Sequence, residues 1–235
     1  MTKSQLMRYL FFIFLVSSFC QGQGIRLGQF DEIKVFDGLR VTIIQSSSDS
    51  LVVEGKNASF FSYKNKNGRL YLRMNIRKRL GGFDTTVALF TSNPIEAIDA
   101  NEGSFVSFQD ALFQPFIKLK SQEGAEIDAV LDVQKVTTKT SSGGMVSLRG
   151  AAKIQEHKLN TGGIVEASNL TSTQADVRVR AGGRAAILAT ELATAIVSLG
   201  GSVRVYGSPH KLVKRVDVGG TIELVNEPPV ETTNE

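Results

Sequence analysis

Four basic residues recur at matching positions of a repeated pattern and are the first candidates for ligand contact. Each stands four residues before a glycine that returns about every 20 residues; they are Lys120, Lys139, Lys158 and Arg178. In a stack of parallel strands this column, which we call the basic ladder, would place like charges about 4.8 Å apart. The basic ladder could follow a polyanion such as an acidic glycan or lipopolysaccharide. It could equally be a solvated face that discourages edge pairing, which is the commoner use of lysine.

Carboxylates form a second column that is relevant to glycan chemistry. Asp128, Glu166 and Glu223 share one position of the repeat. Some β-helices cleave polysaccharides with paired carboxylates, which an inverting glycosidase holds up to about 9.5 Å apart. Ser147 occupies the repeat between Asp128 and Glu166, so these two would lie roughly 10 Å apart. A solvated face explains the column better, and we predict no catalytic residue.

The chain contains few histidine and cysteine residues that could bind a metal or act in catalysis. His157 stands in phase with inward positions, which indicates a core histidine, and His210 follows Ser208-Pro209 in a turn. Two isolated histidines without carboxylates at set spacing do not make a zinc site, and the GxSxG nucleophile motif is absent. We therefore expect no metal site, no cofactor and no enzymatic activity, although a polysaccharide-active enzyme remains the alternative.

The repeat that would position these residues is marked by small residues. The recurring glycines are Gly103, Gly124, Gly143, Gly162, Gly182, Gly200 and Gly219, spaced by 18 to 21 residues. The next residue is always small, and it is glycine in the last five repeats. We predict that these pairs form corners between strands, where glycine adopts backbone angles that a Cβ forbids. The predicted corner residues are Gly143, Gly144, Gly162, Gly163, Gly182, Gly183, Gly200, Gly201, Gly219 and Gly220.

Apolar residues alternate with polar ones after each corner, which is the pattern of a strand buried on one face. A period near 20 residues is typical of a solenoid. A meander sandwich would show mirrored alternate repeats, and a calcium-binding β-roll would show GGxGxD nonapeptides; neither pattern is present. The sequence therefore predicts an all-β fold, a parallel β-solenoid of about 20-residue coils.

Residues 30–92 lack this period but still alternate as strands. We expect strands at 32–36, 39–45, 51–55, 60–64, 69–75 and 86–90. Asp37-Gly38 and Asn67-Gly68 are hairpin signals, so we predict a hairpin-rich segment that caps the opening of the stack. The repeats then run over 93–226. Residues 227–235 are acidic and contain two prolines, which predicts a disordered tail that stops strand addition.

The first 22 residues have the pattern of a signal peptide. Lys3 and Arg8 precede a short apolar run at 10–16, which small residues follow. The only cysteine, Cys20, would be lipidated if the chain were a lipoprotein, but Phe19 stands where a lipobox has a small residue. The chain has a formal net charge of +4, of which the signal peptide carries two charges, so overall charge does not favour nucleic acid. We expect export to the periplasm, the outer-membrane surface or the medium.

Several stretches together resemble one bacterial family, the putative auto-transporter adhesin, head GIN domain family. They are FDEIKVFDGLRVTIIQ (30–45), LVVEG (51–55), NGRLYLRM (67–74), SNPIEAIDANEGSFVSF (92–108) and the glycine repeats that follow. The resemblance covers 25–226 and implies an exported β-solenoid without an established activity. Gly103 and Gly124 depart from the pattern because no second glycine follows them.

These observations favour an exported, non-enzymatic module with a binding or adhesion-type role. Its partner is unknown; an envelope glycan or another protein would suit it, nucleic acid would not, and an oligomer is possible. A purely structural spacer is a further alternative.

Overall fold

The structure is a computed structural model that describes residues 25–75, 77 and 82–226. The predicted signal peptide at 1–22, Cys20 and the predicted tail at 227–235 lie outside the described residues. The short 3-10 helix η1 (Ala58–Phe60) accompanies the strands, and residues 82–84 also have 3-10 conformation. The strands are β1 (Ile25–Arg26), β2 (Glu32–Val35), β3 (Arg40–Gln45), β4 (Ser50–Gly55), β5 (Phe61–Lys66), β6 (Arg69–Met74), β7 (Thr85–Thr91), β8 (Ala97–Ala100), β9 (Phe105–Phe108), β10 (Leu112–Gln122), β11 (Glu126–Ser141), β12 (Met145–Asn160), β13 (Ile164–Arg180), β14 (Arg184–Leu188), β15 (Leu192–Leu199), β16 (Ser202–Tyr206), β17 (Lys211–Val218) and β18 (Thr221–Val225).

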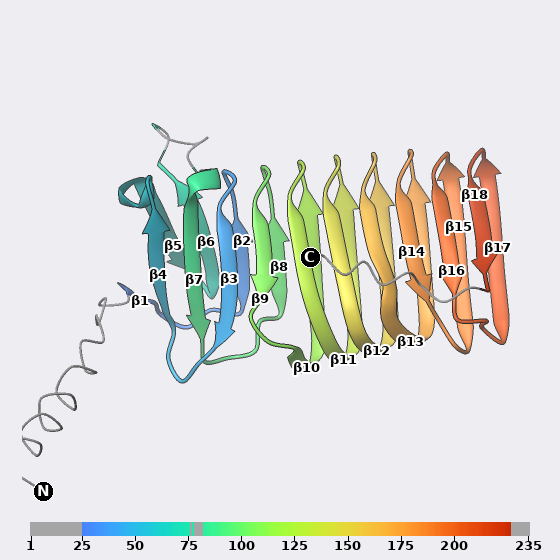
Figure 1. The fold of residues 1–235 in the computed structure, drawn as a ribbon, viewed down its shortest axis with the longest axis horizontal. Helices are drawn as coiled ribbons and strands as arrows, with labels where there is room; N and C mark the ends of the chain where they lie inside the picture. The colour runs from blue at the N-terminus through green and yellow to red at the C-terminus, as the bar shows by residue number, and fades with distance from the viewer. Residues whose placement is uncertain (1–24, 76, 78–81, 227–235) are drawn as a thin grey trace, which may run out of the picture.

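The coils stack in parallel, as predicted (Figure 1). Residues that precede a glycine corner form one face of the stack, here called the pre-corner face, and residues that follow it form the post-corner face. β11, β12 and β13 are long enough to run along the post-corner face, bend, and return along the pre-corner face. β10 pairs with β11 and β11 with β12, both in parallel and residue for residue at a spacing of 19. The sequence period therefore becomes a register that stacks equivalent side chains in columns.

Each corner is a tight turn with positive φ at two successive residues. At the corner between β11 and β12, Ser142 has φ 50° and Gly143 has φ 74°, and the Gly144 N–H donates to the Ser141 carbonyl at 2.9 Å. Both central residues are in the left-handed region, as in a type I′ turn. Gly144 meets a different constraint, since a Cβ there would lie 2.3 Å from the Ser121 carbonyl oxygen of the preceding coil. At this corner the first glycine is needed for conformation and the second for space.

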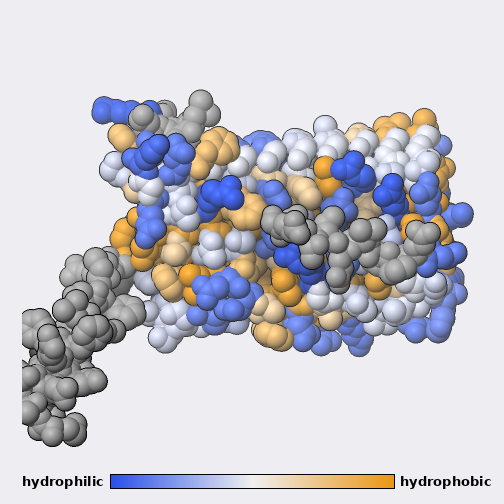
Figure 2. Space-filling view, viewed as in Figure 1, coloured by the Kyte–Doolittle hydropathy of each residue, from blue (hydrophilic) through white to orange (hydrophobic). Residues whose placement is uncertain are grey.

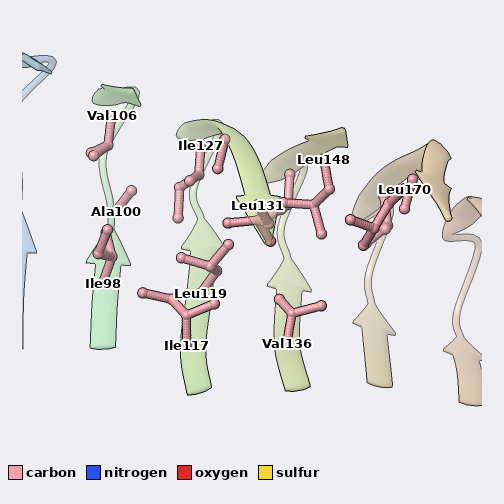
Figure 3. Close-up of a cluster of buried hydrophobic side chains, with 14 of the residues drawn as sticks. Ile98, Ala100, Val106, Ile117, Leu119, Ile127, Leu131, Val136, Leu148 and Leu170 are labelled. Atoms are coloured by element: carbon pink, nitrogen blue, oxygen red, sulfur yellow. The ribbon is translucent and has the colours of Figure 1, made fainter. Parts of the chain in front are cut away.

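The interior is a continuous column of aliphatic side chains between the two faces (Figure 3). Ile117 and Leu119 of β10 lie in the same buried cluster as Ile127 and Leu131, which follow the corner on β11. All four are essentially inaccessible to solvent. Burial of this much apolar surface, at about 25 cal/mol per Å², is the main favourable term for a fold whose strands are far apart in sequence.

The amino-terminal segment contributes two further coils that are out of sequence order. β2 and β3 pair in parallel with β8 and β9 on one side and with β6 and β7 on the other. The order along the stack is thus β6–β7, β2–β3, β8–β9, followed by the regular repeats (Figure 1). Asn67-Gly68 does join the antiparallel pair β5–β6. The hairpin prediction for Asp37-Gly38 was wrong, because β2 and β3 pair with other coils and that turn is a solenoid corner.

The two ends of the stack differ. At the amino-terminal end β4 pairs antiparallel with β7, and β5 with β6, so the hairpin-rich cap is present as expected. At the other end, β17 and β18 have no further strand beside them among the described residues. Val216 and Leu224 are 43% and 47% exposed there. Lys214 is the register partner of buried Ala195, so a charge occupies the inward column of the last coil.

Candidate functional site

The basic ladder lies on the pre-corner face as one continuous column. Register pairs join Lys120 to Lys139, Lys139 to Lys158, and Lys158 to Arg178. Lys139, Lys158 and Arg178 are exposed, and Lys120 is partly buried. The spacing of the repeat was sufficient to predict this adjacency, because a parallel stack converts equal positions into neighbours.

Carboxylates contact the two ends of the basic ladder, and the one at Lys120 is shared with Lys34. The Asp99 carboxylate oxygen Oδ2 lies 3.4 Å from the Lys120 Nζ, and the Asp176 carboxylate lies 3.1 Å from the Arg178 Nε. Within the described part of the chain, neither Lys139 nor Lys158 has a carboxylate within 4 Å. Within the ladder, the residues without a carboxylate partner are therefore Lys139 and Lys158, on adjacent coils whose strands lie about 4.8 Å apart.

A notch adjoins the ladder where β10 begins, and the sequence analysis missed it. β10 pairs with β11 from Leu112 onward, but it pairs with β8 only from Lys118 onward, because β8 starts at Ala97. The start of β10 is therefore a free sheet edge. Phe113 and Phe116 on this edge are 73% and 64% exposed. Two cavities of about 230 and 510 Å³ flank it, and hydrophobic residues show at the lower edge of the stack near the start of β10 (Figure 2).

The larger cavity, of about 510 Å³, lies on the pre-corner face beside the ladder. Its walls are Pro94, Glu96, Gln114, Pro115, Phe116, Ile117, Lys118, Lys135 and Thr137. This volume is within the range of small-molecule sites, about 300–1,000 Å³. The signal available in the sequence was FQPF at 113–116, which places aromatic rings and a proline on a strand whose later outward positions are lysines.

The carboxylate column lies on the post-corner face, as the period predicts. Parallel pairing aligns Asp128, Ser147 and Glu166 in that order. Asp128 lies 3.0 Å from Arg149, and Glu166 lies 3.8 Å from Arg184. Burial raises the pKa of the Glu166 carboxyl, and the neighbouring arginines oppose this shift. Asp128 and Glu166 thus each have a basic partner, which is the arrangement of a charge-balanced surface.

His157 is a fully buried core residue, in agreement with its phase in the repeat. Its Nε2 lies 2.7 Å from the Gln155 Oε1, and its Nδ1 lies 2.8 Å from the Thr138 hydroxyl. Desolvation lowers the pKa of the imidazole to about 3. The neutral ring then donates from Nε2 to Gln155 and accepts at Nδ1 from Thr138. His210 instead is exposed and lies 2.8 Å from Glu191.

The described residues contain no group of three or more His, Cys, Asp or Glu side chains that could hold a metal ion. Among them there is also no helix with the length and hydrophobicity needed to cross a membrane.

Comparison with known proteins places the chain in a family. A family model described as "Putative auto-transporter adhesin, head GIN domain" matches residues 29–209. A crystal structure of a putative adhesin from Bacteroides fragilis is similar, with a TM-score of 0.78, 21% identity, and coverage of 86% of this chain and 95% of the other. No curated protein sequence matches the chain.

Two structures from Parabacteroides distasonis share the fold. A putative adhesin has a TM-score of 0.70 and 20% identity, covering 86% of this chain and 95% of its own. A protein named as a putative lipid binding protein has a TM-score of 0.65 and 14% identity, covering 87% and 96%. At these identities the likeness concerns the fold alone. Because the family model matches most of its length, the chain belongs to the putative auto-transporter adhesin, head GIN domain family.

Proposed function

We propose that the protein is an exported, non-enzymatic binding module that holds an anionic, extended ligand along its pre-corner face. The observation that carries this proposal is the pair Lys139 and Lys158, two exposed ammonium groups on adjacent coils without a carboxylate partner among the described residues. A flat face with a fixed repeat suits a polymer whose own charges repeat. Acidic glycans and lipopolysaccharide are ligands of this kind.

Electrostatics favours this use of the face over a merely solvated one. Elsewhere on the pre-corner face a lysine or arginine is commonly matched by a carboxylate, as in the Lys34–Asp99 pair at 2.8 Å and the Lys135–Glu156 pair at 2.6 Å. Exposed like charges on neighbouring strands cost free energy. An anion bound at Lys139 and Lys158 removes this repulsion. The ligand then supplies the negative charge that carboxylates supply at the other lysines.

Binding of immobilised heparin and lipopolysaccharide tests the proposal. The double variant Lys139→Glu, Lys158→Glu should lose at least about tenfold in affinity, equivalent to about 1.4 kcal/mol. The control Lys64→Glu, Lys66→Glu makes the same change of charge on exposed residues of β5 in the cap and should bind as the wild type does. Affinity should also fall with added salt. An equal loss of affinity in both double variants would show that binding depends on net charge alone, and this result would overturn the proposal.

Export is a separate part of the proposal, and it rests on the signal-peptide pattern of residues 1–22. The mass of the protein recovered from the cell envelope or the medium tests it. A mature chain that lacks the apolar run at 10–16 supports export. Recovery of the full-length chain from the cytoplasm alone contradicts it.

A further inference from the structure

The larger cavity of the notch is the place where the structure presents an aromatic ring among hydrogen-bonding groups. Phe116 is 64% exposed, and it points outward in the same column as Lys135 of the next coil. Around it stand side chains of mixed type, the carboxylate of Glu96, the amide of Gln114, the hydroxyl of Thr137 and the ammonium groups of Lys118 and Lys135. Donors and acceptors are thus both available around one apolar surface.

The amide of Gln114 supplies an independent observation. Its Nε2 donates to the Ile95 carbonyl at 2.8 Å and also to the Phe116 carbonyl. These bonds fix the amide across the notch, between the free edge of β10 and the loop before β8. Its Oε1 is buried and has no hydrogen-bond partner among the described residues. A buried acceptor without a donor costs about 1–3 kcal/mol. Because this oxygen is closed to solvent in the unbound protein, a ligand hydroxyl recovers that cost only when the side chains around the notch shift to open a path to it.

The charges of the notch argue against a site for a simple anion. Lys135 is paired with Glu156 at 2.6 Å, and Glu96 stands on the same rim as Lys118. The positive charge is therefore largely balanced, unlike that of Lys139 and Lys158. An acyl chain would use the apolar walls, but it carries no hydrogen-bond donor for Gln114 and leaves the polar rim unpaired.

We propose that this cavity is a saccharide subsite in which one neutral sugar ring stacks on Phe116 and donates a hydroxyl hydrogen bond to the Gln114 Oε1. The axial C–H groups of a pyranose carry partial positive charge and suit the negative face of an aromatic ring. The remaining hydroxyls can pair with Glu96, Thr137 and Lys118. The inference rests on the proposed function only in that it assumes a glycan ligand, and it adds a contact that does not depend on the basic ladder.

Substitution of the two exposed phenylalanines gives a matched test. Phe113→Ala removes a ring three residues away that is also largely exposed and lines the smaller cavity, of about 230 Å³. Calorimetric titration would use chitotetraose and maltotetraose as neutral probes, a heparin tetrasaccharide as the acidic probe and decanoate as the acyl probe. At least one neutral tetrasaccharide should bind the wild type, Phe116→Ala should weaken it by about tenfold or more, and Phe113→Ala should leave it within about twofold.

A tryptophan at position 116 provides a second test of the site in case an alanine variant folds poorly. The chain has no tryptophan, so Phe116→Trp retains an aromatic surface and introduces a single fluorophore at the site. It should bind the neutral tetrasaccharide and change its emission on titration. Gln114→Leu, which removes the acceptor, should weaken binding in the same protein.

The outcomes separate this proposal from that for the basic ladder. Lys139→Glu, Lys158→Glu should leave the neutral tetrasaccharide unaffected while it weakens heparin. Failure of both neutral tetrasaccharides to bind the wild type, binding of decanoate alone, or equal losses in Phe113→Ala and Phe116→Ala would each overturn the saccharide subsite. None of these results would alter the interpretation of heparin binding at Lys139 and Lys158.

Discussion

At the scale of single residues, the two glycines of a corner meet different physical demands. Gly143 has φ 74°, and a Cβ there would meet nothing within 4 Å, so it is required for its backbone conformation alone. Gly144 lies in an ordinary conformation, but its Cβ would come within 2.5 Å of the Ser121 carbonyl carbon in the preceding coil. The sequence pattern marks both positions, and the structure separates their reasons.

Substitutions at this corner should therefore behave differently. Gly143→Ala should reduce the free energy of unfolding by about 1–2 kcal/mol, the cost of a left-handed residue, and Gly143→Asn should recover part of it because asparagine tolerates that region. Gly144→Ala should cost more, and Gly144→Asn should bring no recovery, since backbone atoms occupy the space. Urea unfolding of the four variants measures this. A recovery by asparagine at both positions would contradict the distinction.

His157 illustrates what a one-dimensional pattern can and cannot supply. Its inward phase was sufficient to predict burial, but its partners come from two positions, Gln155 on the same strand and Thr138 on the preceding coil. Gln155 in turn donates to the Ser172 hydroxyl at 2.8 Å. Such a chain depends on the register between coils and on side-chain conformations, which the period does not specify.

Burial of neutral His157 predicts a pH dependence of stability. Its pKa in the folded protein is about 3, below the ordinary value of 6.5, so between these values the unfolded chain binds the extra proton. Stability should therefore fall by about 1.4 kcal/mol for each pH unit below 6.5 because of this group. Valine occupies the same column in the next coil at Val177. His157→Val should be less stable at pH 7, since Thr138 and Gln155 lose a partner, and should show a shallower loss in acid.

Urea unfolding at several pH values between 4 and 7 measures this difference, because this window crosses the ordinary pKa of 6.5 and stays above the folded-state pKa of about 3. His210→Ala serves as the control because it removes the other histidine and leaves His157 in place. Parallel stability profiles for wild type and His157→Val would show that His157 does not remain neutral in the folded protein.

At the scale of elements, the regular coils could be predicted and the irregular ones could not. The strands from β10 onward follow a period whose register is almost constant, so columns such as Lys120 to Arg178 could be aligned from the sequence. The notch arises from an exception to that period, since β8 begins late and Pro94 to Glu96 form a loop. Nothing in a repeat pattern indicates where a coil is incomplete, and the candidate site is located there.

The two glycine turns of the amino-terminal segment show a second limit. Asp37-Gly38 and Asn67-Gly68 both have positive φ at their two central residues. The first joins strands on opposite faces of the stack and the second joins an antiparallel pair. The turn determines that the chain reverses direction. The side-chain pattern around it does not indicate whether the flanking strands pair with each other or with other coils.

At the scale of the whole molecule, the order of the coils gives the two ends different roles. β2–β3 lies between two coils that come later in sequence, so it is paired on both sides only after β6–β9 have formed. Among the described residues, β17–β18 in contrast pairs only with the coil before it. In a solenoid, stability is approximately a sum over coils and their nearest neighbours, so loss of an internal coil removes two interfaces.

Two deletions test this asymmetry. A chain that ends at Gly207 lacks β17 and β18 and should still fold, with a lower free energy of unfolding and a retained β-sheet circular dichroism spectrum. Deletion of residues 29–46 removes β2 and β3 and should abolish cooperative unfolding, because β6–β7 and β8–β9 lose their shared partner. Similar cooperative transitions in the two proteins would contradict the inserted order of the coils.

We expect Lys214 to prevent a second molecule from stacking on the last coil. A second stack that docked on β17 and β18 in continuation of the fold would have to bury this ammonium in an aliphatic interior, which is expensive without a counter-charge. Lys214→Val should allow the molecules to join through their exposed end coils, and light scattering coupled to size exclusion would detect dimers or larger species. If the Lys214→Val protein were strictly monomeric, a feature other than Lys214 would be what prevents end-to-end stacking. The predicted consequence is that one charged side chain in an otherwise apolar column keeps two stacks from joining end to end.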